Sequence, residues 1–185
     1  MPAETVRAET IAVLRESQRL GFLGSRPVEQ AAEHAAAFAA GLGMLPARAR
    51  LIDLGSGGGL PGLVLAELLP QCSILLVDRR QKRTDFLQRA VRRLGLDDVE
   101  VREADVGTIA RDVVAGTQAP FDAVTARSFG PPEHTLRLAR QLVAEGGRIV
   151  ISEPPSGERW DPHLLADLGL VSERVGPVRV FHVKR

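Results

Sequence analysis

The feature that most constrains this chain is an apolar run that ends in an acid and a glycine-rich turn, Leu51-Ile52-Asp53-Leu54-Gly55-Ser56-Gly57-Gly58-Gly59-Leu60-Pro61-Gly62. Glycine permits positive φ angles and leaves no Cβ between the backbone and a ligand. Proline suits the first helical position, where its missing N–H would be unpaired anyway, so we expect a helix to open at Pro61. A strand, a tight turn and a helix in this order predict the first βα unit of a doubly wound sheet.

The acid before the glycines indicates which ligand this turn would hold. The turn of the NAD fingerprint, G-x-G-x-x-G, cradles a pyrophosphate, but here Leu60 replaces the third glycine and Asp53 would repel a phosphate. A carboxylate suits an ammonium group or a hydroxyl instead. Acid-x-Gly-x-Gly-x-Gly is typical of class I S-adenosylmethionine (SAM) methyltransferases, whose cofactor carries an amino acid moiety and no phosphate. We therefore predict a SAM site, with loop candidates Asp53, Ser56, Gly57 and Gly59; a plain βα turn without ligand is the alternative.

Length and composition set the class of protein. The 185 residues predict one domain, with a helical cap over residues 1–48 and a Rossmann-like core over residues 49–185. A net charge of +1 argues against steering of nucleic acid by the whole protein, although a local basic face remains possible. The single Cys72 excludes an internal disulfide and offers no metal cluster. Without a signal peptide or a membrane-length apolar run, we expect a cytoplasmic protein with no metal and no membrane contact.

The spacing of apolar residues predicts a class I SAM-methyltransferase fold: a seven-stranded, mostly parallel sheet with an antiparallel C-terminal strand. The two helices ahead of the first strand either cap the site or only cover the sheet. Gly146-Gly147-Arg148 is expected to form a turn. Beyond the first βα unit, strands are expected at residues 73–77, 99–101, 121–126, 149–151, 171–175 and 178–183, and helices at residues 3–20, 27–42, 79–94, 106–115, 132–143 and 160–168.

Two acids stand where parallel strands end. Asp78 follows the second strand, about 20 residues past the glycines, where an acid binds the ribose hydroxyls of a cofactor in doubly wound folds. The same carboxylate can also cap the next helix. Asp105 follows the third strand, at the place where such folds contact the adenine amine.

The helix predicted after Asp78 combines an apolar face with many basic side chains. Such a face is either simply solvated or a phosphate-binding patch. In the second interpretation, Arg89, Arg92 and Arg93 are the candidates for binding RNA. The seven basic residues are Arg79, Arg80, Lys82, Arg83, Arg89, Arg92 and Arg93.

Three segments between residues 50 and 150 resemble one family, the glucose-inhibited division B proteins, which are bacterial methyltransferases of N7 of a guanosine in 16S ribosomal RNA. Residues 53–62 are similar to its D-[VI]-G-[ST]-G-x-G-[LF]-P-G motif. Asp78 with Lys82-Arg83 and Phe86-Leu87 resembles its D-x-x-x-K-R-x-x-F-L segment, and residues 125–130 resemble its S-R-A-F-A segment. The resemblance implies SAM contacts from Gly55, Leu60, Asp78, Ala104 and Asp105.

The same resemblance places Arg127 where methionine and the target base meet. A guanidinium there can donate a fork of hydrogen bonds to the methionine carboxylate or to guanine O6, and it stays protonated, so it aligns the reactants without moving a proton. A structural salt bridge to Asp53 or Asp122 is the alternative role. N7 methylation needs no general base, because N7 has a free lone pair. In keeping with this, no His or acid follows the fourth strand.

The chain also departs from the family pattern. Glu103 replaces an Arg, Glu153-Pro154 replaces a Lys-Gly, the N-terminal N-L-T-[SA] segment is absent, and the chain is short for the family. Acidic residues at two basic positions weaken the argument for RNA, because phosphate contacts supply much of RNA affinity. Three interpretations follow: an enzyme that methylates 16S rRNA or the small ribosomal subunit, a SAM methyltransferase of a small molecule or other substrate, and a SAM-binding module without turnover.

Overall fold

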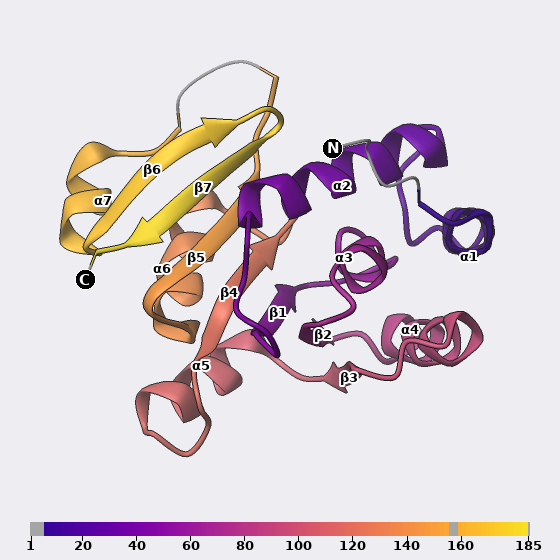
Figure 1. The fold of residues 1–185 in the computed structure, drawn as a ribbon, viewed down its shortest axis with the longest axis horizontal. Coiled ribbons are helices and arrows are strands. Elements are labelled where there is room, and N and C mark those ends of the chain that lie inside the picture. The colour runs from indigo at the N-terminus through magenta and orange to yellow at the C-terminus, as the bar shows by residue number, and fades with distance from the viewer. Residues whose placement is uncertain (1–5, 156–158, 185) are drawn as a thin grey trace.

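The computed structural model describes residues 6–155 and 159–184. Its centre is a seven-stranded sheet with the strand order β3-β2-β1-β4-β5-β7-β6 (Figure 1). The first five strands are parallel, and β7 runs antiparallel between β5 and β6. This confirms the predicted class I methyltransferase fold with an antiparallel C-terminal strand. The strands are β1 (Arg50–Leu54), β2 (Ser73–Asp78), β3 (Val99–Glu103), β4 (Phe121–Ala126), β5 (Val143–Ser152), β6 (Leu170–Val175) and β7 (Val178–Val183).

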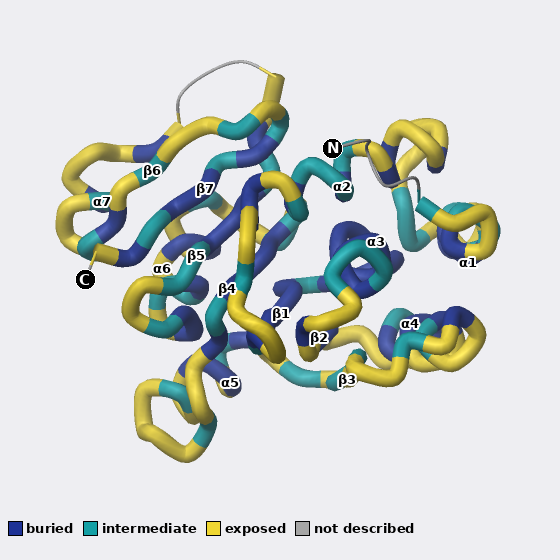
Figure 2. The backbone as a smooth tube through the Cα atoms, in the orientation of Figure 1, coloured by how far each residue is buried: buried dark blue, intermediate teal, exposed yellow. Residues whose placement is uncertain are grey.

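Helices cover both faces of the sheet, which explains the almost continuous apolar runs in the central strands. In β1, Leu51 packs with residues of α3 and α4, whereas its neighbours Ile52 and Leu54 pack with residues of α5 and α6. The central strands β1, β2 and β4 are mostly dark in Figure 2, whereas the edge strands β3 and β6 are largely intermediate or exposed. The helices are α1 (Ala8–Arg19), α2 (Val28–Leu42), α3 (Gly62–Leu68), α4 (Gln81–Leu94), α5 (Val106–Val114), α6 (Pro132–Leu142) and α7 (Pro162–Asp167).

The two N-terminal helices pack against the glycine-rich turn as well as against the sheet. A small core joins Leu14 of α1 and Ala35 of α2 to Leu60 and Val64 after the turn. The buried Ser17 hydroxyl donates a hydrogen bond of 2.8 Å to the Gly58 carbonyl. The helices therefore fix the back of the loop. Residues 3–5 of the first predicted helix lie outside the described residues.

The structure corrects the sequence expectations at three places. Gly146 and Gly147 lie within β5, not in a turn before it, because β5 bulges: Phe121 pairs with Val143 and Ala123 already with Arg148. The helix predicted at residues 79–94 begins at Gln81. Of the helix predicted at residues 160–168, only Pro162–Asp167 (α7) is helical.

Membrane and metal sites can be checked in the part of the chain that the structure describes. No helix there is long and apolar enough to span a bilayer. Likewise, those residues contain no group of three His, Cys, Asp or Glu side chains placed to hold a metal ion.

Candidate active site

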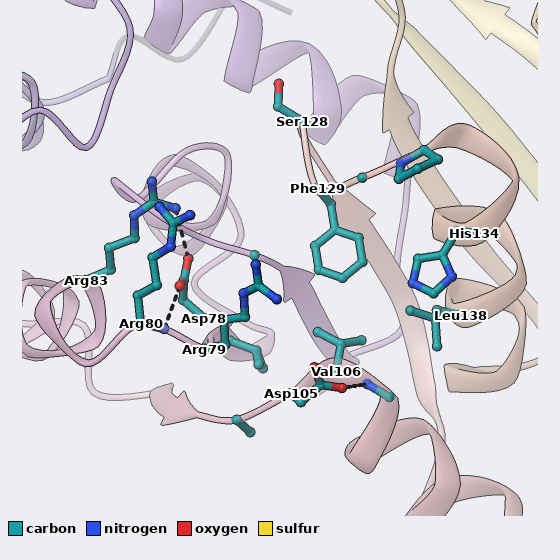
Figure 3. Close-up of a pocket in the computed structure, with 16 residues that line it drawn as sticks. Asp78, Arg79, Arg80, Arg83, Asp105, Val106, Ser128, Phe129, His134 and Leu138 are labelled. Atoms are coloured by element: carbon teal, nitrogen blue, oxygen red, sulfur yellow. Dashed lines mark hydrogen bonds and ion pairs between the residues drawn. The ribbon is translucent and has the colours of Figure 1, made fainter.

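A cavity of about 410 Å³ lies where the first four strands end. Its walls come from the segments that follow β1, β2, β3 and β4, including Gly55, Asp78, Ala104 and Asp105. Figure 3 shows Asp78 with Arg80 and Arg83 on one side, and Phe129 with His134 and Leu138 facing them. Carboxyl ends of parallel strands are where doubly wound folds bind their ligands. Four of the predicted site residues are thus brought together on one cavity, which we call the first cavity.

The first glycine of the turn is required by close packing. Gly55 has φ +65°, and a Cβ there would lie 2.7 Å from Cδ2 of Phe129, too close for any larger residue. Phe129 therefore rests on the glycine turn and forms part of the cavity wall. The other predicted loop residues, Ser56, Gly57, Gly59 and Leu60, are buried and are not among the residues that line the first cavity.

Asp78 joins the glycine turn to the start of α4. Its Oδ2 accepts a hydrogen bond of 3.0 Å from the Gly57 N–H and lies 3.4 Å from the Arg83 guanidinium. Its Oδ1 accepts a bond of 2.9 Å from the Arg80 N–H. The carboxylate is nearly buried and lines the cavity. The prediction that Asp78 caps the next helix is wrong, because the N-cap of α4 is Arg80 and no side chain caps it; Asp78 binds the backbone of the turn before the helix instead.

Ala104 and Asp105 form the far wall, after β3. The Asp105 carboxylate caps α5, because its Oδ1 accepts a hydrogen bond of 2.8 Å from the Gly107 N–H. This cap fixes the turn and orients the backbone of both residues along the cavity.

Asp53 lies beneath the loop rather than on the cavity surface. It is completely buried; the Thr125 hydroxyl donates a hydrogen bond of 2.8 Å to Oδ1, and Oδ2 has no hydrogen-bond partner. Burial raises the pKa of Asp53 to about 6, and the hydroxyls of Thr125 and Ser56, the Gly62 N–H and the positive charge of Arg127 oppose this rise. A carboxylate that is costly to ionise therefore sits below the glycine turn.

A second cavity, of about 490 Å³, adjoins the first. Ser128, Phe129 and Gly130 line both cavities, so this segment is the wall between them. Ser128 has φ +53°, an uncommon conformation for a residue other than glycine. The remaining lining of the second cavity comes from the turn before α2, from α2 itself, from the start of α6 and from the segments after β4 and β5.

Arg127 lines the second cavity. Its Nη1 is buried and has no hydrogen-bond partner, and no ion pair joins it to Asp53 or Asp122 among the described residues. Burial lowers the pKa of Arg127, the charge of Arg26 lowers it further, and Asp53 opposes both. Among the described residues, Arg127 thus forms no salt bridge to Asp53 or Asp122, although the charge of Asp53 acts on it.

The basic residues of α4 do not act as one group. Arg83 contacts Asp78 in the first cavity, whereas Arg89, Arg92 and Arg93 are exposed farther along the helix. Arg93 lies 3.3 Å from Glu16 of α1. Among the described residues, neither Arg89 nor Arg92 forms an ion pair, so these two charges face solvent without a counter-charge.

Sequence reasoning did not identify three residues that shape the cavities. These residues are Phe129, His34 and Arg26. Burial lowers the pKa of His34, followed by the charges of Arg127 and Arg26, so its imidazole is mostly neutral at pH 7. Only the packing of the N-terminal turn against the strand ends brings Arg26 and His34 to the site.

Comparison with known proteins agrees with this geometry. Residues 13–154 match the family model GidB, described as rRNA small subunit methyltransferase G. A "Ribosomal RNA small subunit methyltransferase G" from Laribacter hongkongensis is 40% identical over 103 residues, which cover 56% of this chain and 47% of that protein. The protein of the same name from Rubrobacter xylanophilus is 33% identical over 184 residues, covering 84% of this chain and 68% of that protein. The chain spans about half the length of the first two curated relatives it matches.

Solved structures share the fold at low sequence identity. A putative O-methyltransferase from Klebsiella pneumoniae superposes with a TM-score of 0.65 at 17% identity, covering 97% of this chain and 91% of the other. A SAM-dependent methyltransferase from Aquifex aeolicus gives a TM-score of 0.60 at 16% identity, covering 91% and 96%. These likenesses establish the class I methyltransferase fold.

Proposed function

Because the chain belongs to the rRNA small subunit methyltransferase G family, we propose that it transfers a methyl group from SAM to N7 of a guanosine in 16S rRNA. The observation that carries the proposal is the pair of adjoining cavities, which share the wall Ser128–Gly130. One cavity has the features of a cofactor site and the other holds Arg127. Methyl transfer requires two ligands to meet at such a boundary.

The residues of the first cavity fit SAM. Asp78 offers carboxylate oxygens at the position where doubly wound folds bind ribose hydroxyls, and the turn at Ala104 and Asp105 would contact the adenine. Gly55 provides the close backbone approach beside the methionine chain, and Leu60, Ser56, Gly57 and Gly59 would support that backbone. The buried Asp53 would act through its negative charge, which favours the ammonium group of methionine over a phosphate.

The reaction requires alignment rather than proton transfer. SAM supplies a methyl group on a positively charged sulfur, which is a good leaving group. The N7 lone pair attacks this carbon directly, so the protein must hold the two atoms about 3–3.5 Å apart and in line with the sulfur. Arg127 would donate hydrogen bonds to guanine O6 or to the methionine carboxylate, and it remains protonated at the working pH. His34, although mostly neutral, is not needed as a base.

The substrate would be the 16S rRNA within the small ribosomal subunit, which places the protein in the cytoplasm. Arg89, Arg92 and Arg93 of α4 would contact RNA phosphates. The acidic departure at Glu153 does not oppose this assignment, because its buried carboxylate accepts hydrogen bonds from Trp160, at 2.7 Å, and from Arg159, at 3.2 Å. Glu153 thus lies buried in the wall of the second cavity, where Arg159 balances its charge and Oε2 has no hydrogen-bond partner.

The direct test uses small ribosomal subunits from a strain that lacks this methylation. The protein is incubated with them and with SAM labelled on the methyl group, and the label is then mapped in the 16S rRNA. We expect label on N7 of one guanosine, and none when Arg127 is replaced by Ala. Label on a small molecule of a cell extract, with none on the subunits, would instead favour a different substrate.

A further inference from the structure

The lining of the second cavity includes two arginines, Arg26 and Arg127, that form no direct ion pair, and the imidazole of His34. Arg26, His34 and Arg127 line it from three separate segments. Among the described residues, neither Arg26 nor Arg127 forms an ion pair. The acid of this lining, Glu153, is fully buried and already engaged by Arg159 and Trp160. The two guanidinium groups repel each other; the buried Asp53 offsets part of this repulsion at Arg127, and an anion bound beside Arg26 would offset more of it.

Arg26 is held at the cavity by its neighbours. The side chain of Gln18 on α1 donates hydrogen bonds to two backbone carbonyls, Gly24 O at 2.6 Å and Arg26 O at 2.8 Å. These bonds fix the turn between α1 and α2. The exposed Arg26 therefore reaches the cavity from a positioned backbone, while the buried Nη1 of Arg127 lies without a partner on the other side.

We propose that Arg26 binds the phosphate group of a single unstacked nucleotide whose base enters the second cavity beside Arg127 and Phe129. This proposal rests on the proposed function and deepens it. N7 of guanine lies in the deep major groove of paired RNA, which side chains do not reach, so the base must leave a helix or come from a single-stranded segment. Phe129 offers an aromatic surface on which such a base can stack. A charged phosphate contact from Arg26 would fix the nucleotide while Arg127 remains free for the base.

The test measures binding of guanosine, 5′-GMP and 3′-GMP by calorimetry to the full chain with S-adenosylhomocysteine present, so that the first cavity is filled. We expect at least one of the two nucleotides to bind about tenfold more tightly than guanosine, as for a charge-assisted contact. Arg26→Gln should abolish this difference and leave the affinity for guanosine unchanged. Arg19→Gln, which removes an exposed arginine of α1 outside the cavity, is the matched control and should keep it.

Four results would overturn the proposal. The first two are that neither nucleotide binds more tightly than guanosine, including no binding at all, or that the preference survives in Arg26→Gln. The third is competition by inorganic phosphate as strong as by GMP, which indicates a bare anion site, and the fourth is weaker S-adenosylhomocysteine binding in Arg26→Gln, which assigns Arg26 to the methionine carboxylate. The methyl-labelling assay on ribosomal subunits distinguishes failure of the Arg26 phosphate site from failure of the proposed function. If Arg26→Gln methylates subunits normally, the enzyme assignment stands and the phosphate site fails. If GMP binding depends on Arg26 but no rRNA is labelled, the phosphate site stands and the rRNA substrate fails.

Discussion

Replacing Asp53 by Asn should stabilise the fold and weaken cofactor binding. The carboxylate is completely buried, and one of its oxygens has no hydrogen-bond partner. Asparagine has the same shape, keeps an oxygen for the Thr125 hydroxyl and carries no charge. At neutral pH the wild-type protein must bury an ionised group here, whereas the variant buries a neutral one.

The size of the expected change in the free energy of unfolding follows from the pKa of Asp53. Burial raises it from 3.8 to about 6. The folded state therefore binds this proton more tightly than the unfolded state, so the contribution of Asp53 to stability is most favourable at low pH and is lost as the pH rises from about 4 to about 6. At 1.36 kcal/mol per pH unit, the loss above this range is about 3 kcal/mol. The Asp53→Asn variant should thus be more stable by up to about 3 kcal/mol at pH 7.5, and by only about 1 kcal/mol at pH 4.5.

The assay is urea unfolding of both proteins at pH 7.5 and pH 4.5, with SAM affinity measured at pH 7.5. Asp85→Asn, which removes an exposed carboxylate of α4, is the control and should change stability by less than about 0.5 kcal/mol. Loss of stability in Asp53→Asn at pH 7.5 would refute the reasoning, since the ionised carboxylate would then be a stabilising group. A gain that does not shrink toward pH 4.5 would show that the effect is not electrostatic. Unchanged SAM affinity would remove Asp53 from the cofactor site.

Three further predictions concern the cavities and the basic helix. Asp78→Ala should weaken SAM binding by about 1.5–3 kcal/mol, the value for lost hydrogen bonds to a charged group, and calorimetry with equal affinity would exclude the ribose contact. Replacing Arg89, Arg92 and Arg93 together by Gln should lower RNA affinity and flatten its dependence on salt; an unchanged slope of log affinity against log salt would mean that this face is only solvated. Arg127→Lys keeps the positive charge but loses the pair of hydrogen bonds that a guanidinium donates, so turnover should fall roughly tenfold to a thousandfold with no new pH dependence near neutrality. Full activity of this variant on the true substrate would contradict the proposed role of Arg127 in aligning the reactants.

The sheet and part of the first cavity were predictable because they depend on local patterns. Apolar runs that end in an acid or a glycine mark the strand ends, and parallel strands place those ends at one edge. Gly55, Asp78 and Asp105 therefore came together as expected. The bulge of β5 was not predictable, because it depends on how Phe121 and Ala123 pair with a distant segment.

The second cavity depends on contacts that no local pattern contains. Arg26 stands in a polar turn and His34 on an alanine-rich helix, and neither position differs from an ordinary surface residue by its neighbours in sequence. They reach the site only because Gln18 fixes the turn and α2 packs on the far end of the sheet. Asp53 could have been placed better: strand alternation puts it on the face opposite Ile52 and Leu54, directed at the helix after the glycines rather than at the ligand.

Asp53 Oδ2 and Arg127 Nη1 are both buried without a hydrogen-bond partner, and the two side chains carry opposite charges. Asp53 Oδ2 belongs to β1, and Arg127 Nη1 follows β4, the neighbouring strand. Each unsatisfied group costs about 1–3 kcal/mol, so a fold selected for stability alone would replace both. The methionine part of SAM carries a positive ammonium, which would act on Asp53 through its charge, and guanine O6 would accept the hydrogen bond that Arg127 Nη1 lacks. On the proposed function, the ammonium charge of bound SAM lowers the cost of ionising the buried Asp53, so a gain in stability on removing Asp53 should come with a loss in SAM affinity.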